Sequence, residues 1–128
     1  MPGHGDEKAC KFIRPWRMIE DGEVIIVETP IFTRHVTRLL DEEEYRLIQL
    51  YLADRPDAGA VLRGSGGLRK LRWSRRGIGK RGGVRTIYYW AVEVDTLLML
   101  TIYTKAAKSG LTTEQRAILR AVVEREFR

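Results

Sequence analysis

The chain has 128 residues, a formal net charge of +6 and 44% hydrophobic residues, which suits one domain with a single core. No apolar run approaches the roughly 18 residues of a transmembrane helix, and the single cysteine, Cys10, cannot form an internal disulfide. The first residues lack the apolar core of a signal peptide, so we expect a cytoplasmic protein without a membrane partner.

The first 22 residues follow neither a helical nor a strand period. They mix Pro, Gly and charged residues with scattered apolar ones, which predicts a loosely ordered extension over residues 1–22. Residues 23–128 are then expected to form the folded domain.

Regular structure is predicted to begin with Val24–Val27, a β-branched run typical of a strand. Thr29 and Pro30 fit the N-cap and first position of a short helix. Asp41, with Glu44 three residues later, fits the start of a second helix. Apolar residues at three-to-four spacing give each of these helices one apolar face.

A turn and a strand are predicted after the second helix. The glycine-rich residues 64–67 fit the turn, and Leu68–Trp73 fit the strand. Alternation places Lys70 and Arg72 on the face opposite the apolar residues of that strand.

Two more strands and a helix complete the chain. A short connection separates Val84–Val92 from Leu97–Tyr103, which predicts an antiparallel hairpin. Thr112 and Gln115 fit a capping box at the start of an amphipathic final helix. This order predicts an α+β fold: a small, mainly antiparallel sheet with the two N-terminal helices packed on one face, a C-terminal helix, and the other face free.

Positive charge is concentrated in about a quarter of the chain. From Ala58 to Val92 there are nine basic residues and no Asp or Glu, which leaves 14 basic against 17 acidic residues elsewhere. A surface of one sign concentrates polyanions, so the asymmetry indicates a partner that carries phosphates. A solubilising surface is the alternative, although such surfaces usually mix both signs.

The common catalytic and cofactor motifs are absent from the sequence. No group of His and Cys residues has metal-ligand spacing, and His35 fits a helix surface. The glycine-rich loop is not a nucleotide-binding loop, because Arg81 follows Lys80 where Ser or Thr is needed. We therefore expect no metal and no cofactor.

The basic strand residues could serve either RNA cleavage or RNA binding. In cleavage the ribose 2′-OH is the nucleophile, which requires a base for its proton and donors for the developing phosphorane charge. Arginine suits the second role, and Lys70 suits the first because neighbouring Arg69 and Arg72 would depress its pKa. Four aromatic residues offer either base-stacking surfaces or core packing: Tyr88, Tyr89, Trp90 and Tyr103.

Three stretches of the sequence resemble one protein family. They are GSGGLRKLRW with GKRGGVRTIYY (residues 64–73 and 79–89), LTIYTK (residues 100–105), and the Leu-Thr pair at 111–112. In this order, and with the opening ETPIF at residues 28–32, they resemble the HigB branch of the RelE/ParE toxin superfamily of bacterial type II toxin–antitoxin systems. The likeness covers residues 24–127.

This resemblance implies a RelE-like fold and a small, metal-independent endoribonuclease. Such a toxin enters the ribosomal A site, contacts ribosomal RNA and cuts messenger RNA there, which inhibits translation. The resemblance also implies a cognate HigA-like antitoxin with a helix-turn-helix domain. Operator DNA would be contacted only through that antitoxin.

The family places its active residues on the free face of the sheet, and basic residues of this chain match them. Lys70 and Arg72 match the strand positions, and Arg85 matches the arginine that contacts the scissile phosphate. Lys105 and Lys108 match the basic positions after the last strand. These five are the predicted catalytic residues, and the predicted RNA-binding residues are Arg69, Lys80, Arg81 and Tyr103.

One difference from the family leaves the general base open. Some relatives have a tyrosine in the last segment, where Thr112 or Thr113 stands here, so its role passes to Tyr103 or to no residue. The gyrase-poisoning members share the fold without the RNA site. A gyrase-inhibiting toxin, an inactive toxin and a non-enzymatic nucleic-acid-binding or regulatory protein are therefore alternatives to the ribonuclease.

Overall fold

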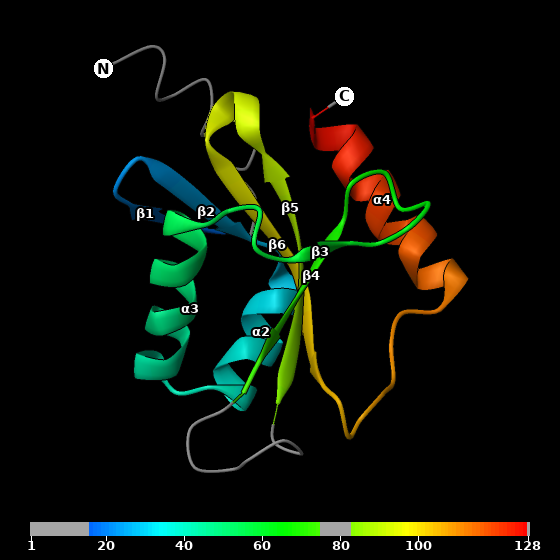
Figure 1. The fold of residues 1–128 in the computed structure, drawn as a ribbon, viewed down its shortest axis with the longest axis horizontal. Helices are drawn as coiled ribbons and strands as arrows, with labels where there is room; N and C mark the ends of the chain where they lie inside the picture. Colours follow the sequence, from blue (N-terminus) through cyan, green and yellow to red (C-terminus); the bar gives the residue numbers. More distant parts are fainter. Residues whose placement is uncertain (1–15, 75–82, 128) are drawn as a thin grey trace.

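The computed structural model describes residues 16–74 and 83–127, which form one six-stranded sheet and three helices (Figure 1). The strand order is β1-β2-β6-β5-β4-β3. In chain order the elements are β1 (Arg17–Asp21), β2 (Val24–Glu28), α2 (Pro30–Leu39), α3 (Glu42–Asp54), β3 (Ala60–Val61), β4 (Arg69–Trp73), β5 (Val84–Ala91), the 3-10 turn η2 (Val92–Val94), β6 (Thr96–Thr104) and α4 (Thr113–Phe127).

The predicted starts of the first two helices are confirmed. Thr29 caps α2, since its hydroxyl accepts a hydrogen bond from the backbone N–H of Phe32 at 3.1 Å, and Pro30 follows at the first helical position. Asp41 caps α3 in the same way, accepting from the backbone N–H of Glu44 at 2.7 Å. Both caps satisfy amide groups that have no partner within the helix.

The sheet is mainly antiparallel, as predicted. β5 and β6 form the expected hairpin, and β4 pairs antiparallel with β5. The exception is β2, which pairs in parallel with β6. A parallel neighbour requires a long crossover, and the chain between β2 and β6 includes α2, α3 and three strands.

Both faces of the sheet carry a core, and different helices cover them (Figure 1). The first core cluster joins α2 and α3 to the sheet through residues that include Phe32, Val36, Ile48, Leu52, Leu71, Tyr88 and Met99. The second core cluster joins α4 to the other face through Leu68, Ile87, Leu98, Leu100, Tyr103 and Val123, with Leu119 and Val122 against it. The face that we expected to be free is therefore partly covered, because α4 has an apolar stripe of its own.

The sheet begins earlier than the sequence predicts. Arg17–Asp21 form β1, antiparallel to β2, inside the segment expected to be a loosely ordered extension. The strand is held by a contact distant in sequence: Arg17 forms an ion pair at 2.8 Å with Glu28, whose side chain is 0% exposed. The folded domain therefore starts before residue 23, whereas residues 1–15 lie outside the described part of the chain.

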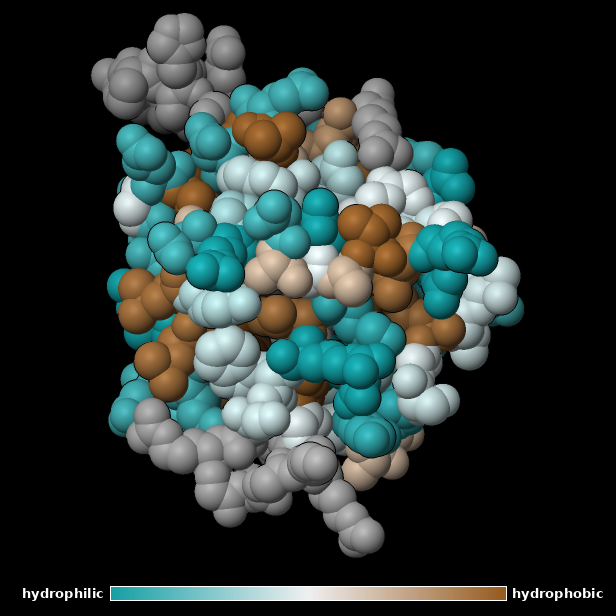
Figure 2. Space-filling model, in the orientation of Figure 1, coloured by the Kyte–Doolittle hydropathy of each residue, from teal (hydrophilic) through white to brown (hydrophobic). Residues whose placement is uncertain are grey.

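Apolar side chains are also exposed along α3. Leu47, Leu50 and Tyr51 are large hydrophobic residues on the surface of that helix. Figure 2 shows apolar groups at the left of the molecule, where α3 lies, and a mixture of hydrophilic and apolar groups over its centre. Within the described residues, no helix is both long enough and apolar enough to cross a membrane.

Candidate functional site

Three side chains form a row across the strands in the middle of the sheet. Arg72 on β4 is the register partner of Arg85 on β5, and Arg85 is the register partner of Tyr103 on β6. Directly opposite residues of antiparallel strands project from the same face. This cross-strand row lies on the face that α4 partly covers, since Tyr103 belongs to the second core cluster.

Lys70 lies beside this row. It is two residues before Arg72 on the same strand, so both side chains project from one face. Burial lowers the pKa of the Lys70 amine, and the positive charges of Arg72, Arg85 and Arg116 lower it further. The structure thus brings Lys70, Arg72 and Arg85 together, and no ion pair among the described residues joins any of the three to a carboxylate.

The hydroxyl of Tyr103 lies near these cations, and its ring is shielded from solvent. The side chain is 7% exposed, and its hydroxyl has no hydrogen-bond partner in the described structure. Burial raises the pKa of Tyr103, an effect that the charges of Arg85, Arg72 and Arg116 oppose. The amine of Lys108 lies 5.0 Å from the ring centroid, so the ring is not available to stack on a base.

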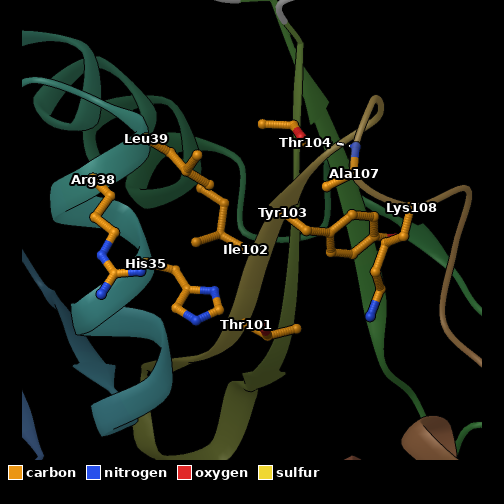
Figure 3. A pocket seen from close by; sticks show the side chains of 9 residues that line it. All are labelled: His35, Arg38, Leu39, Thr101, Ile102, Tyr103, Thr104, Ala107 and Lys108. Atoms are coloured by element: carbon orange, nitrogen blue, oxygen red, sulfur yellow. Dashed lines mark hydrogen bonds between the residues drawn. The ribbon is translucent and has the colours of Figure 1, made fainter.

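Lys108 is positioned by the first turn of α4. Its amine donates to the side-chain oxygen of Gln115 at 3.0 Å. Gln115 also accepts from the backbone N–H of Thr112, and its own N–H donates to the Thr112 hydroxyl, which confirms the predicted capping box. In Figure 3, Tyr103 and Lys108 lie on one side of β6 and Ile102 on the other.

The remaining predicted site residues are not part of this arrangement. Lys105 is exposed in the turn after β6, where its backbone N–H donates to the Gly83 carbonyl at 3.3 Å. Arg69 is on the same face of β4 as Leu71, opposite Lys70, and donates to the carbonyls of Asp57 and Gly59 at 3.0 and 2.8 Å. It therefore fastens a loop and does not join the row. Lys80 and Arg81 lie outside the described residues.

Arg116 also belongs to the site, although nothing in its local sequence pattern indicates this. It lies in the first half of α4, and its guanidinium donates to the Arg63 carbonyl at 3.0 Å. Its charge acts on both Lys70 and Tyr103. No local sequence pattern identifies Arg116, because only the packing of α4 on the sheet brings its side chain to the site. Lys70, Arg72, Arg85, Tyr103 and Arg116 are called the cationic cluster below.

The other aromatic candidates pack in the core. The hydroxyl of Tyr88 accepts from the backbone N–H of Gly59 and donates to the Pro56 carbonyl, at 2.8 and 2.7 Å. The Tyr89 ring lies 5.6 Å from that of Phe127, and Trp90 packs against the first core cluster. These contacts favour core packing over base stacking for all three.

A groove of about 290 Å³ adjoins the site between α2 and β6. His35 and Arg38 lie on its helical side, and Tyr103, Thr104 and Lys108 line its other side (Figure 3). His35 thus lies on a helix surface next to the groove. In the described residues, no three His, Cys, Asp or Glu side chains come together as a metal site would require.

The cationic cluster can bind an anion and stabilise negative charge that develops on it. Arginine stays protonated at any physiological pH and donates several hydrogen bonds in fixed directions. Lys70 differs, because its lowered pKa increases the fraction of neutral amine that could accept a proton.

No protein-family model matches the chain. Its fold is similar to that of a free-state structure of the E. coli toxin RelE, a mutant with two arginines replaced by alanine. The likeness has a TM-score of 0.53 at 16% sequence identity, and it covers 74% of this chain and 94% of that chain. It confirms the RelE-like α+β fold, with its mostly antiparallel sheet.

Proposed function

We propose that this protein is the toxin of a type II toxin–antitoxin system of the HigB branch, a ribosome-dependent endoribonuclease that cuts messenger RNA in the A site. The observation that carries the proposal is the cationic cluster, in which Arg72, Arg85 and Lys70 share one face and form no ion pair with any carboxylate of the described residues. Like charges directly opposite each other on neighbouring strands destabilise a sheet, and an anionic partner bound between Arg72 and Arg85 would remove that cost.

The geometry supports cleavage through the 2′-OH of the RNA itself. Lys70, as the neutral amine, would take the proton of the 2′-OH, whose oxygen then bonds to the adjacent phosphorus. Arg72 and Arg85 would stabilise the negative charge that this attack places on the phosphate oxygens. The bond from phosphorus to the 5′ oxygen breaks, and that oxygen takes a proton, leaving a 2′,3′-cyclic phosphate and a 5′-hydroxyl.

Lys108 and Lys105 are the candidate donors of that last proton. Lys108 is the better placed, because Gln115 and the Tyr103 ring hold its amine beside the cationic cluster. Lys105 is exposed after β6 and would instead contact the RNA backbone or ribosomal RNA. Each contact to a phosphate adds affinity that decreases with salt.

Antitoxin and operator DNA belong to the same proposal. A HigA-like antitoxin with a helix-turn-helix domain would neutralise the toxin in the cytoplasm, and operator DNA would be bound through it alone. The gene next to this one provides a direct check, because a toxin of this type requires a small helix-turn-helix protein encoded there.

The decisive experiment is cleavage of messenger RNA on programmed ribosomes by purified protein. We expect cuts within codons at the A site by the wild type, and none by Lys70→Ala or Arg85→Ala. Arg55→Ala is the matched control, because Arg55 is an exposed arginine whose ion-pair partner is Asp54. Binding without cleavage by the wild type would favour a non-enzymatic nucleic-acid-binding protein, and inhibition of gyrase supercoiling would favour the gyrase-directed alternative.

A further inference from the structure

Buried polar atoms without partners are concentrated beside the cross-strand row. Among the described residues, the buried side-chain atoms without a hydrogen bond are Nε of Arg85, Oγ1 of Thr86, the hydroxyl of Tyr103 and Nε of Arg116. Three of these four atoms belong to the cationic cluster. Buried polar groups are rarely left unpaired, so such a concentration requires an explanation.

These three atoms lie close to one another. Arg85 and Tyr103 are direct partners across β5 and β6. Arg116 comes from α4, which packs on the same face through the second core cluster that includes Tyr103, and its charge acts on the Tyr103 hydroxyl as that of Arg85 does. The unpaired atoms therefore all lie on the side of the sheet that faces the first turns of α4.

What these atoms lack is an acceptor. The two Nε–H groups can only donate, and a tyrosine hydroxyl beside cations also has a proton to donate. No carboxylate among the described residues forms an ion pair with Arg85 or Arg116. A single oxygen with negative charge would accept from all three, and hydrogen bonds to a charged acceptor are the strong ones.

We propose that Tyr103, Arg85 and Arg116 form one oxyanion site, in which the Tyr103 hydroxyl and the two Nε–H groups donate to the same phosphate oxygen. The proposal rests on the proposed function for its natural ligand, an RNA phosphodiester. It adds Arg116 as a binding residue from α4, and it assigns Tyr103 to binding through its hydroxyl and not through its ring.

The surrounding contacts fix these donors in place. The Arg63 carbonyl holds the guanidinium of Arg116 at 3.0 Å, and Lys108 covers the Tyr103 ring. Farther along α4, Arg120 donates to the Gly64 carbonyl at 3.5 Å, which fastens the helix to the same turn. Donors held before the ligand arrives lose little conformational freedom on binding.

The test measures binding of inorganic phosphate to the full chain by calorimetry, with chloride at equal ionic strength as the reference. Tyr103→Phe removes only the hydroxyl oxygen, and Arg116→Lys keeps the charge but removes the Nε–H. Arg120→Lys is the matched control, because Arg120 lies on the same helix and contacts the same turn without belonging to the cluster. We expect each of the first two variants to bind phosphate about tenfold more weakly than the wild type.

The melting temperature in chloride separates binding from folding. We expect Arg120→Lys to bind phosphate as the wild type does, and Tyr103→Phe to melt in chloride no lower than the wild type, because it removes an unpaired buried group. Equal phosphate affinity in all four proteins, or no phosphate binding by the wild type, would overturn the proposal. Phosphate binding in the expected pattern without cutting of messenger RNA on ribosomes would refute the nuclease and leave the oxyanion site standing.

Discussion

Arg72 and Arg85 are directly opposite each other on β4 and β5, with both side chains on the face of the sheet that α4 partly covers. Like charges at opposed positions of an antiparallel pair destabilise a sheet. An anion bound between the two guanidinium groups would reverse the sign of this effect. The pairing therefore makes stability and activity depend in opposite ways on the same residues.

The change Arg72→Thr should stabilise the fold and impair the proposed activity. Arg72 is exposed and Thr is favoured in strands, so we expect the free energy of unfolding to rise by about 0.5 kcal/mol at low salt. The gain should shrink near about 1 M salt, which screens the repulsion. Urea titrations at the two salt concentrations measure it, and cleavage on programmed ribosomes should decrease about tenfold or more.

Arg55→Thr is the control for this change, since Arg55 follows α3 and has no cation as a strand partner. Its effect on unfolding should not depend on salt in the same way. A decrease in stability for Arg72→Thr at both salt concentrations would show that the opposed arginines do not repel each other.

The lowered pKa of Lys70 predicts a pH dependence of stability. Burial and the nearby arginines make the folded chain bind this proton more weakly than the unfolded chain does. Between the lowered pKa and the ordinary lysine value, the unfolded state carries more protons, so the free energy of unfolding should rise with pH across that window. Urea titrations over this range should show the wild type gaining stability relative to Lys70→Met as the pH rises. The comparison with the variant is needed because the raised pKa values of Tyr45 and Tyr103 lower the stability of both proteins toward high pH.

The same shift predicts the pH dependence of cleavage. If the neutral amine of Lys70 takes the 2′-OH proton, the single-turnover rate should rise with pH until that amine is fully deprotonated. Lys70→Arg keeps the positive charge but cannot lose its proton, so its residual rate should be low and should not rise with pH. A wild-type rate that does not change over this range would assign the base to another group.

The sequence predicts the local features of this fold and not the contacts between distant segments. The caps at Thr29 and Asp41 and the hairpin of β5 and β6 depend on residues close in the chain, and the structure confirms them. β1 was not predicted, because the buried Glu28 that pairs with Arg17 is eleven residues away. No local pattern reveals such a partner.

For the site, too, the sequence predicts the local features but not the contacts between distant segments. Alternation alone puts Lys70 and Arg72 on one face, and it also puts Arg69 on the opposite face, so the sequence already argued against Arg69 as a partner in the site. The registers that align Arg72 with Arg85 and Arg85 with Tyr103 depend on how the strands pair, which the sequence does not show. The position of Arg116 likewise depends on how α4 packs on the sheet, and the amphipathic pattern of that helix does not predict it.

A buried carboxylate at the end of β2, next to the edge strand β1, should contribute strongly to stability. Glu28 is 0% exposed and accepts hydrogen bonds from Arg17, from the Thr33 hydroxyl at 2.7 Å and from the Tyr45 hydroxyl. Burial and the charge of Glu28 raise the pKa of Tyr45, which keeps its hydroxyl a donor. Arg17→Met should lower the free energy of unfolding by about 2 kcal/mol, because it leaves the buried charge partly unpaired.

Arg46→Met is the comparison for that loss. Arg46 pairs with Asp21 at 3.2 Å, near the same strand but with its own side chain 51% exposed, and surface pairs contribute less than about 1 kcal/mol. Urea titrations of both variants at pH 7 separate the two values. Equal losses would mean that Arg17 acts only by holding the edge strand and not by pairing with the buried charge of Glu28.

Gly59→Ala should destabilise the fold and slow the proposed cleavage of messenger RNA. A Cβ atom at Gly59 would lie 2.8 Å from the Tyr88 ring, 2.9 Å from its hydroxyl and 3.1 Å from the backbone of Lys70. Tyr88 is fully buried and holds this loop by its hydroxyl, so the strain must shift either the ring or β4 itself.

For Gly59→Ala we expect a loss of about 1–3 kcal/mol in the free energy of unfolding, together with slower cleavage of messenger RNA under conditions in which the variant is still folded. Gly110→Ala should change neither, because no atom lies within 4 Å of its added Cβ, and full activity of a folded Gly59→Ala variant would show that the position of Lys70 tolerates such a shift.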